Sequence, residues 1–229
     1  MKRITLLLSL MMALLLASTS TVAAQSTDLD IEAISESVLA VEPEALVDAL
    51  GATPDDSVLP EGFVNPESGT PANEEIIAAF SSPIGDLDGA VGTVTHGLDT
   101  DPDVVPGLIS SGIITYIVAD EEITDDDVAD FEEGARESME DNSDPSVEAA
   151  VESVEVAGVD SVQIEVVTTQ DDVVSVVQIV AIPVGNTFVI GTVVVADQAE
   201  VDEAEVLDFA NEVGIAGVEN LGIVAEDAG

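Results

Sequence analysis

Positive charge is almost absent from this sequence. Lys2 and Arg3 lie at its start, and Arg136 is the only other lysine or arginine, against 48 aspartates and glutamates. A fold for this chain must keep its carboxylates hydrated and apart, because almost none of them can be paired with a cation. Salt screens such repulsion, with a screening length of ~10 Å at 0.1 M and ~3 Å at 1 M. We therefore expect a protein adapted to high ionic strength.

The same charge decides which partners are excluded. Nucleic acids and anionic membranes bind through lysine and arginine, so we expect neither as a partner. Cations and basic proteins are attracted instead, and weak binding of Ca²⁺ or Na⁺ is expected. A simpler alternative is an acidic protein that needs only solubility, but near-complete loss of lysine goes further than solubility requires. The apolar fraction of 46% supplies a core, unlike that of disordered acidic chains.

The first 24 residues have the layout of a secretory signal peptide. The two N-terminal cations precede an apolar run from Ile4 to Ala17, and Val22 and Ala24 occupy the small-residue positions before a cleavage site. The run is shorter than the ~20 residues that span a bilayer. The chain also has no cysteine for a lipid anchor, a disulfide or thiolate chemistry. We expect residues 25–229 to be secreted, extracellular or in the cell envelope, without a membrane anchor.

Beyond the signal, the composition changes near residue 75. Apolar spacing predicts two short helical stretches between Asp28 and Leu50, the second starting at Pro43. Residues 51–75 are rich in Pro, Gly, Asp and Ser, which is typical of a linker. We expect residues 25–75 to form short helices and this linker, and residues 76–229 to form an α+β domain.

Five strands are predicted in that domain. The segments Gly89–Gly97 and Gly112–Asp120 alternate as strands do. Between Ser161 and Asp197, three β-branched runs are separated by "QDD" and "VGN", which predicts a three-stranded antiparallel meander. The two later runs are nearly continuous in apolar residues, which indicates central strands covered by helices. The predicted fold is α+β, with an antiparallel sheet of about five strands packed with helices and a helical N-terminal segment.

Two longer helices complete this prediction. The first begins after Thr124, a good N-cap with Asp127 three residues on. The second follows the meander and is expected to stop at Gly214. Their buried stripes are Val128, Phe131, Ala135 and Met139 in the first, and Val206, Leu207, Ala210 and Val213 in the second.

Arg136 lies four residues from both Glu132 and Glu140 on the first of these helices. That spacing most simply makes the arginine an intrahelical salt-bridge partner. His96, the only histidine, has no cysteine or second histidine to form a zinc site and no nucleophilic serine motif to serve. We therefore assign no catalytic residue and no cofactor, and we expect the chain not to be an enzyme.

Calcium is the second interpretation. Asp99, Asp101 and Asp103 stand at alternating positions, as in the first half of an EF-hand loop. Val104 occupies the position of the required glycine, and Ser110 that of the bidentate glutamate. The segment is not an EF-hand, and the three aspartates are kept only as weak metal-site candidates.

The segment "VEVAGVDSVQIEVVTTQDDVVSVVQIVAIPVGNTFVIGTVVVAD" and the helix after it resemble, in element order, the PsbP-like group of folds. That group includes photosystem extrinsic proteins and LpqN-type exported lipoproteins of mycobacteria. The resemblance covers residues 89–215, and the missing cysteine departs from the lipoprotein members. It implies a binding, assembly or accessory role, and no residue assignment transfers with it.

We therefore expect a secreted, acidic, salt-adapted binding or envelope-associated module, whose partner is an unknown protein or small ligand. The alternatives are a calcium-dependent adhesion or scaffold protein and, third, a small carboxylate- or metal-dependent hydrolase. A glycosidase would need aromatic surfaces for sugar stacking, whereas the chain has 5 Phe, 1 Tyr and no Trp.

Thermal unfolding of residues 25–229 should shift smoothly to higher temperature as NaCl rises to molar concentration, because salt screens the repulsion among carboxylates. CaCl₂ at matched ionic strength should give the same shift. A large, saturable increase with calcium alone would contradict this expectation and favour the calcium-dependent class.

Overall fold

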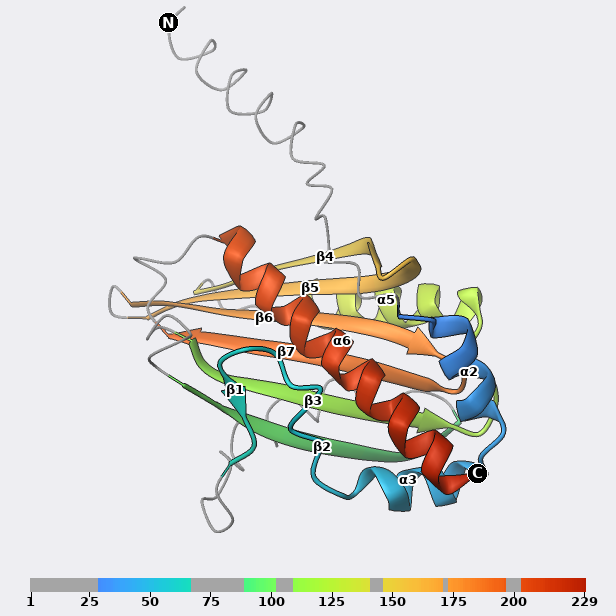
Figure 1. Cartoon of the computed structure of the whole chain (residues 1–229). Helices are drawn as coiled ribbons and strands as arrows, with labels where there is room; N and C mark the ends of the chain where they lie inside the picture. Colours follow the sequence, from blue (N-terminus) through green and yellow to red (C-terminus); the bar gives the residue numbers. More distant parts are fainter. Residues whose placement is uncertain (1–28, 67–88, 102–108, 141–145, 171–172, 197–202) are drawn as a thin grey trace, which may run out of the picture.

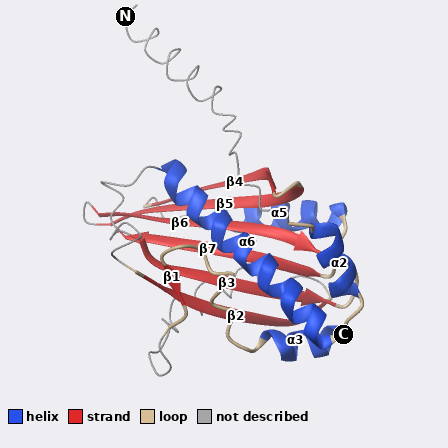
Figure 2. Cartoon of the chain, in the orientation of Figure 1, coloured by secondary structure: helices blue, strands red, loops and turns tan. Residues whose placement is uncertain are grey.

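A seven-stranded antiparallel sheet is the centre of the computed structural model, which describes residues 29–66, 89–101, 109–140, 146–170, 173–196 and 203–229 (Figure 1). Helices pack on both faces of this sheet (Figure 2). The α+β class predicted from the sequence is confirmed. The signal peptide predicted for residues 1–24 lies outside the described residues.

The strands follow one another across the sheet in the order β1-β2-β3-β7-β6-β5-β4. In chain order they are β1 (Phe63–Val64), β2 (Ala90–Thr100), β3 (Ile109–Ala119), β4 (Val147–Val156), β5 (Val159–Gln170), β6 (Val173–Val184) and β7 (Thr187–Ala196). The predicted meander is present as β5, β6 and β7, and β4 extends it. β6 and β7 are interior strands, as their apolar runs predicted, since such runs bury both faces.

β4 is the long strand that the sequence analysis did not identify. Its sequence, "VEAAVESVEV", contains three glutamates and two alanines, residue types that are depleted in strands. Pairing with β5 makes this segment a strand. The register is continuous, from Val147 opposite Thr168 to Val156 opposite Val159. The expected count of about five strands therefore omitted this edge strand and the two-residue β1.

Of the described helices, three cover one face of the sheet and one covers the other (Figure 1). The first three are α2 (Ile31–Leu39), α3 (Pro43–Leu50) and α6 (Glu203–Ala228), and the fourth is α5 (Asp125–Glu140). The predicted short N-terminal helices are thus present, and they share one core with the sheet and α6. Among the described helices, none is both long enough and apolar enough for a bilayer crossing.

The cap of α5 is as predicted. The Thr124 backbone N–H and hydroxyl both donate to Asp127 Oδ2, at 2.7 and 2.6 Å, and the Asp127 N–H donates back to Thr124 Oγ1 at 3.4 Å. These bonds lower the pKa of the Asp127 carboxyl. The predicted stripe of α5 packs against β3, β5, β6 and β7 through an apolar cluster, in which the Phe131 and Phe188 rings stack at 5.0 Å.

The prediction that the last helix stops at Gly214 was wrong, because α6 continues to Ala228. A Cβ placed on Gly191 of β7 would lie 2.3 Å from the Gly214 backbone nitrogen. The two glycines therefore let the helix and strand backbones approach each other closely. Tertiary contact, and not helix termination, explains Gly214.

Gly191→Ala should lower the free energy of unfolding by about 1–3 kcal/mol, because its methyl group would overlap the α6 backbone. Urea unfolding at molar salt measures the change. Gly134→Ala is the matched control, since a Cβ there has no neighbour within 4 Å, and it should be neutral or stabilising. Equal stabilities of the two variants would contradict the close approach of α6 to β7.

Candidate binding site

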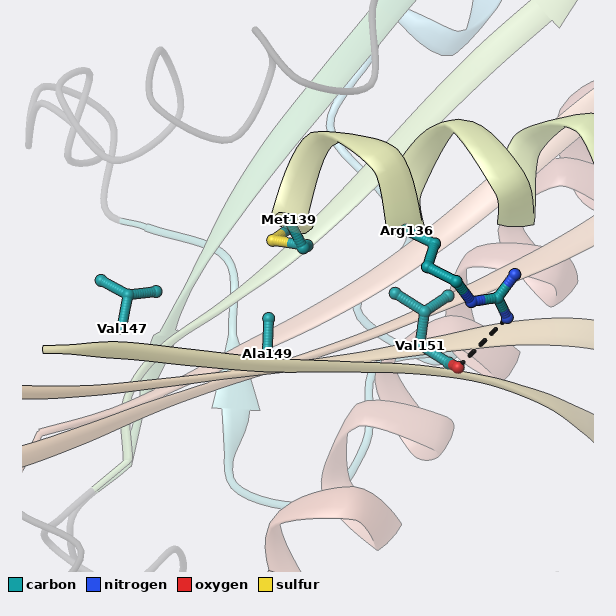
Figure 3. A pocket seen from close by; sticks show the side chains of 5 residues that line it. All are labelled: Arg136, Met139, Val147, Ala149 and Val151. Carbon is teal, nitrogen blue, oxygen red and sulfur yellow. Dashed lines mark hydrogen bonds between the residues drawn. The ribbon is translucent and has the colours of Figure 1, made fainter. Parts of the chain in front are cut away.

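A groove opens between α5 and the edge strand β4 (Figure 3). Its volume is about 360 Å³, and it is lined by Arg136, Met139, Val147, Ala149 and Val151. Met139, the last residue of the apolar α5 stripe, is half-buried like the two valines, while Ala149 is exposed. The groove thus combines four apolar side chains with the one cation that the chain has after residue 3.

Arg136 joins α5 to β4. Its guanidinium donates to Glu132, which confirms the predicted salt bridge, and to the Val151 carbonyl at 3.5 Å (Figure 3). Ser153 on β4 donates its hydroxyl to the second oxygen of Glu132 at 2.8 Å. The hydrogen bond from Ser153, followed by that from Arg136, lowers the pKa of the Glu132 carboxyl. The side chain of Glu140, the other expected partner, lies outside the described part.

The sequence analysis missed the β4 residues of this site, because it did not predict β4. The alternation of Val147, Ala149 and Val151 was the available signal. Alternation becomes informative only when a neighbouring strand fixes which face is buried, and here β5 does so.

His96 lies in β2 and is paired with Ile114 of β3. Ile114 belongs to the core on the face of the sheet opposite α5, so the His96 side chain lies on that face too. Its Nε2 is 2.9 Å from the Leu50 carbonyl oxygen at the end of α3. The ring meets Tyr116 edge-on at 6.1 Å. Burial lowers the pKa of His96, and the hydrogen bond to Leu50 opposes part of this shift. These contacts assign His96 a structural role that links β2 to α3.

A chain of neutral hydrogen bonds runs beside this histidine. Tyr116 donates its hydroxyl to the Gly217 carbonyl at 3.2 Å and accepts from Asn220 Nδ2 at 3.0 Å. Asn220 Oδ1 in turn accepts from the Asp55 N–H at 3.1 Å. Burial raises the pKa of Tyr116. The chain ties β3, α6 and the loop after α3 together without using a charged side chain.

The calcium candidates are only partly within the described structure. Asp99 is exposed and stands opposite Val64, and the Asp101 N–H donates to the Gly62 carbonyl at 2.8 Å. The backbone is therefore paired as an extended strand here and does not curl around an ion. Asp103 lies outside the described residues, so the three-aspartate site stays a prediction. Among the residues that are described, no three His, Cys, Asp or Glu side chains gather as metal ligands.

Comparison with known proteins identifies no family. No family model and no curated protein matches the sequence. A solved structure of a protein of unknown function from Pseudomonas aeruginosa is similar over 47% of this chain and 72% of its own, at 11% identity and a TM-score of 0.29. The resemblance to the PsbP-like group stays a prediction.

His96→Gln should reduce the loss of stability between about pH 7 and pH 5. Because the folded-state pKa of His96 lies below the ordinary value of about 6.5, the unfolded state binds this proton more readily. The contribution of neutral His96 to the stability of the folded state is complete above the pKa of the unfolded state. It is lost as the pH falls through the pKa of the folded state. The carboxylates titrate in both proteins, so the difference between their urea-unfolding curves isolates the histidine. Parallel pH profiles would contradict this account.

Proposed function

We propose that this chain is an exported, salt-adapted binding module without a catalytic role of its own, and that it binds another protein through the α5–β4 groove. The observation that carries this proposal is the groove itself, an open hollow at the edge of the sheet in which four apolar side chains lie beside the guanidinium of Arg136, on a strongly acidic chain. Exposed apolar side chains rimmed by polar residues can mark protein interaction sites.

The size of the groove favours side chains of a partner over a cofactor. Its volume of about 360 Å³ is at the small end of ligand pockets, which range over about 300–1,000 Å³. Several apolar side chains of a bound segment would be needed to fill such a space. The small side chain of Ala149 is exposed and points from β4 toward α5 (Figure 3).

Two observations weigh against hydrolysis as the function. The ring nitrogen of His96 is bound to the Leu50 carbonyl, on the other face of the sheet from the groove. Glu132, the carboxylate beside the groove, accepts from Ser153 and Arg136. Its lowered pKa keeps it ionised at neutral pH, which is unsuitable for a general acid.

A library of short extended peptides, displayed at molar salt, tests the proposed function. Molar salt removes non-specific attraction to the acidic surface. Peptides that bind the wild-type protein should lose binding to Ala149→Trp, whose indole fills the groove. Ala45→Trp is the control, because it places the same ring at an exposed position of α3, on the other face of the sheet from the groove and away from β4. If every bound peptide is insensitive to Ala149→Trp, the groove is not the binding site.

A further inference from the structure

β4 is an edge strand of the described sheet, and its outward backbone groups have no strand partner among the described residues. The bond from the Thr169 N–H to the Ser146 carbonyl, at 2.8 Å, shows that the even-numbered residues here direct their backbone toward β5. The β4–β5 turn at Ala157 and Gly158, with φ of 51° and 85°, continues this pattern to the hairpin end. The odd-numbered residues of β4 therefore direct their N–H and C=O groups outward.

The outward-facing residues of β4 also line the groove. Val147, Ala149 and Val151 have their side chains on the α5 face and their backbone groups at the free edge. In an antiparallel addition, a residue paired with one of these residues places its side chain on the same face. A strand added to β4 would thus bond to the edge and insert every second side chain beside the groove.

Arg136 does not block this addition. Its bond to the Val151 carbonyl, at 3.5 Å, is at the long limit for a hydrogen bond. An incoming N–H can replace it while the guanidinium keeps its partner Glu132. Among the described residues, no other side chain bonds to an outward carbonyl of β4.

The charges of β4 select the partner. Glu148 and Glu152 are exposed on the face opposite the groove, where alternate side chains of an added strand would lie. A second copy of this chain would bring the same carboxylates side by side, since its β4 carries no cation. Lysine or arginine at these positions would instead be attracted by both glutamates.

We infer that β4 is a docking strand for an extended, cationic segment of another protein, in which basic residues alternate with small apolar ones. The segment adds antiparallel to β4, its apolar residues occupy the α5–β4 groove, and its basic residues lie beside Glu148 and Glu152. This inference rests on the proposed function and names the class of partner.

Two N-methylated isomers of one fluorescent peptide test the inference. The peptide has the length of β4 and alternates lysine with valine. In the proposed pairing the valine amides point at β4 and the lysine amides point away. Fluorescence anisotropy with the full protein should therefore show that the N-methyl-valine isomer binds about tenfold or more weakly than the N-methyl-lysine isomer. The isomers have equal charge and composition, so attraction to the acidic surface cannot separate them.

Equal affinities of the isomers, or the reverse preference, would overturn strand addition. If Ala149→Trp still abolishes binding in that case, the groove-binding function stands without this mode; if it has no effect, both proposals fail. The double variant Glu148→Gln/Glu152→Gln should weaken the lysine peptide several-fold relative to Glu121→Gln/Glu122→Gln, which changes the net charge equally at the end of β3. Dimerisation of the free protein through β4 at molar salt would also overturn the inference.

Discussion

The shortage of cations decides how this fold holds itself together. A buried carboxylate needs a positive partner or a set of donors, and the chain has one arginine after residue 3. Among the described side chains, no aspartate or glutamate is fully buried. The two glutamates of α6 whose pKa is raised by burial, Glu212 and Glu219, remain partly in solvent. Stability must therefore come from apolar contacts and neutral hydrogen bonds.

Neutral side chains make the hydrogen bonds that connect separate elements of this fold. Asn186 donates to the Ala119 carbonyl at 2.9 Å, and Asn220 bridges Tyr116 and the loop after α3. His96 connects β2 to α3 through a carbonyl. The single ion pair among the described residues, Arg136 with Glu132, lies at the surface and joins a helix to the sheet edge. Ion pairs at the surface contribute little to stability. The Arg136–Glu132 pair is therefore more important for where it holds the Arg136 side chain than for its free energy.

Local patterns predicted the parts of the fold whose signals lie within one element. The α5 cap, its buried stripe and the β5–β7 meander belong to this group, because capping and alternation are local properties. β4 could not be predicted, because its pairing with β5 stabilises it. The second half of α6 was missed because Gly214 looks like a helix stop, whereas it allows close contact with Gly191 of β7. The groove could not be predicted for the same reason, since three of its five lining residues come from β4. Of its lining residues, Arg136 was predicted as a salt-bridge partner and Met139 as part of the apolar α5 stripe, and neither was predicted as part of a site.

The position of α6 also decides when this core can form. The helix follows all seven strands in the sequence, yet it packs on β3, β6 and β7 and against both α2 and α3. Until α6 docks, the apolar face of the central strands is open to water and the short N-terminal helices have little to pack against. Folding should thus be slow and strongly cooperative, because its stabilising contacts join distant parts of the chain. A nascent chain would lack the cover of this apolar face until α6 has been synthesised.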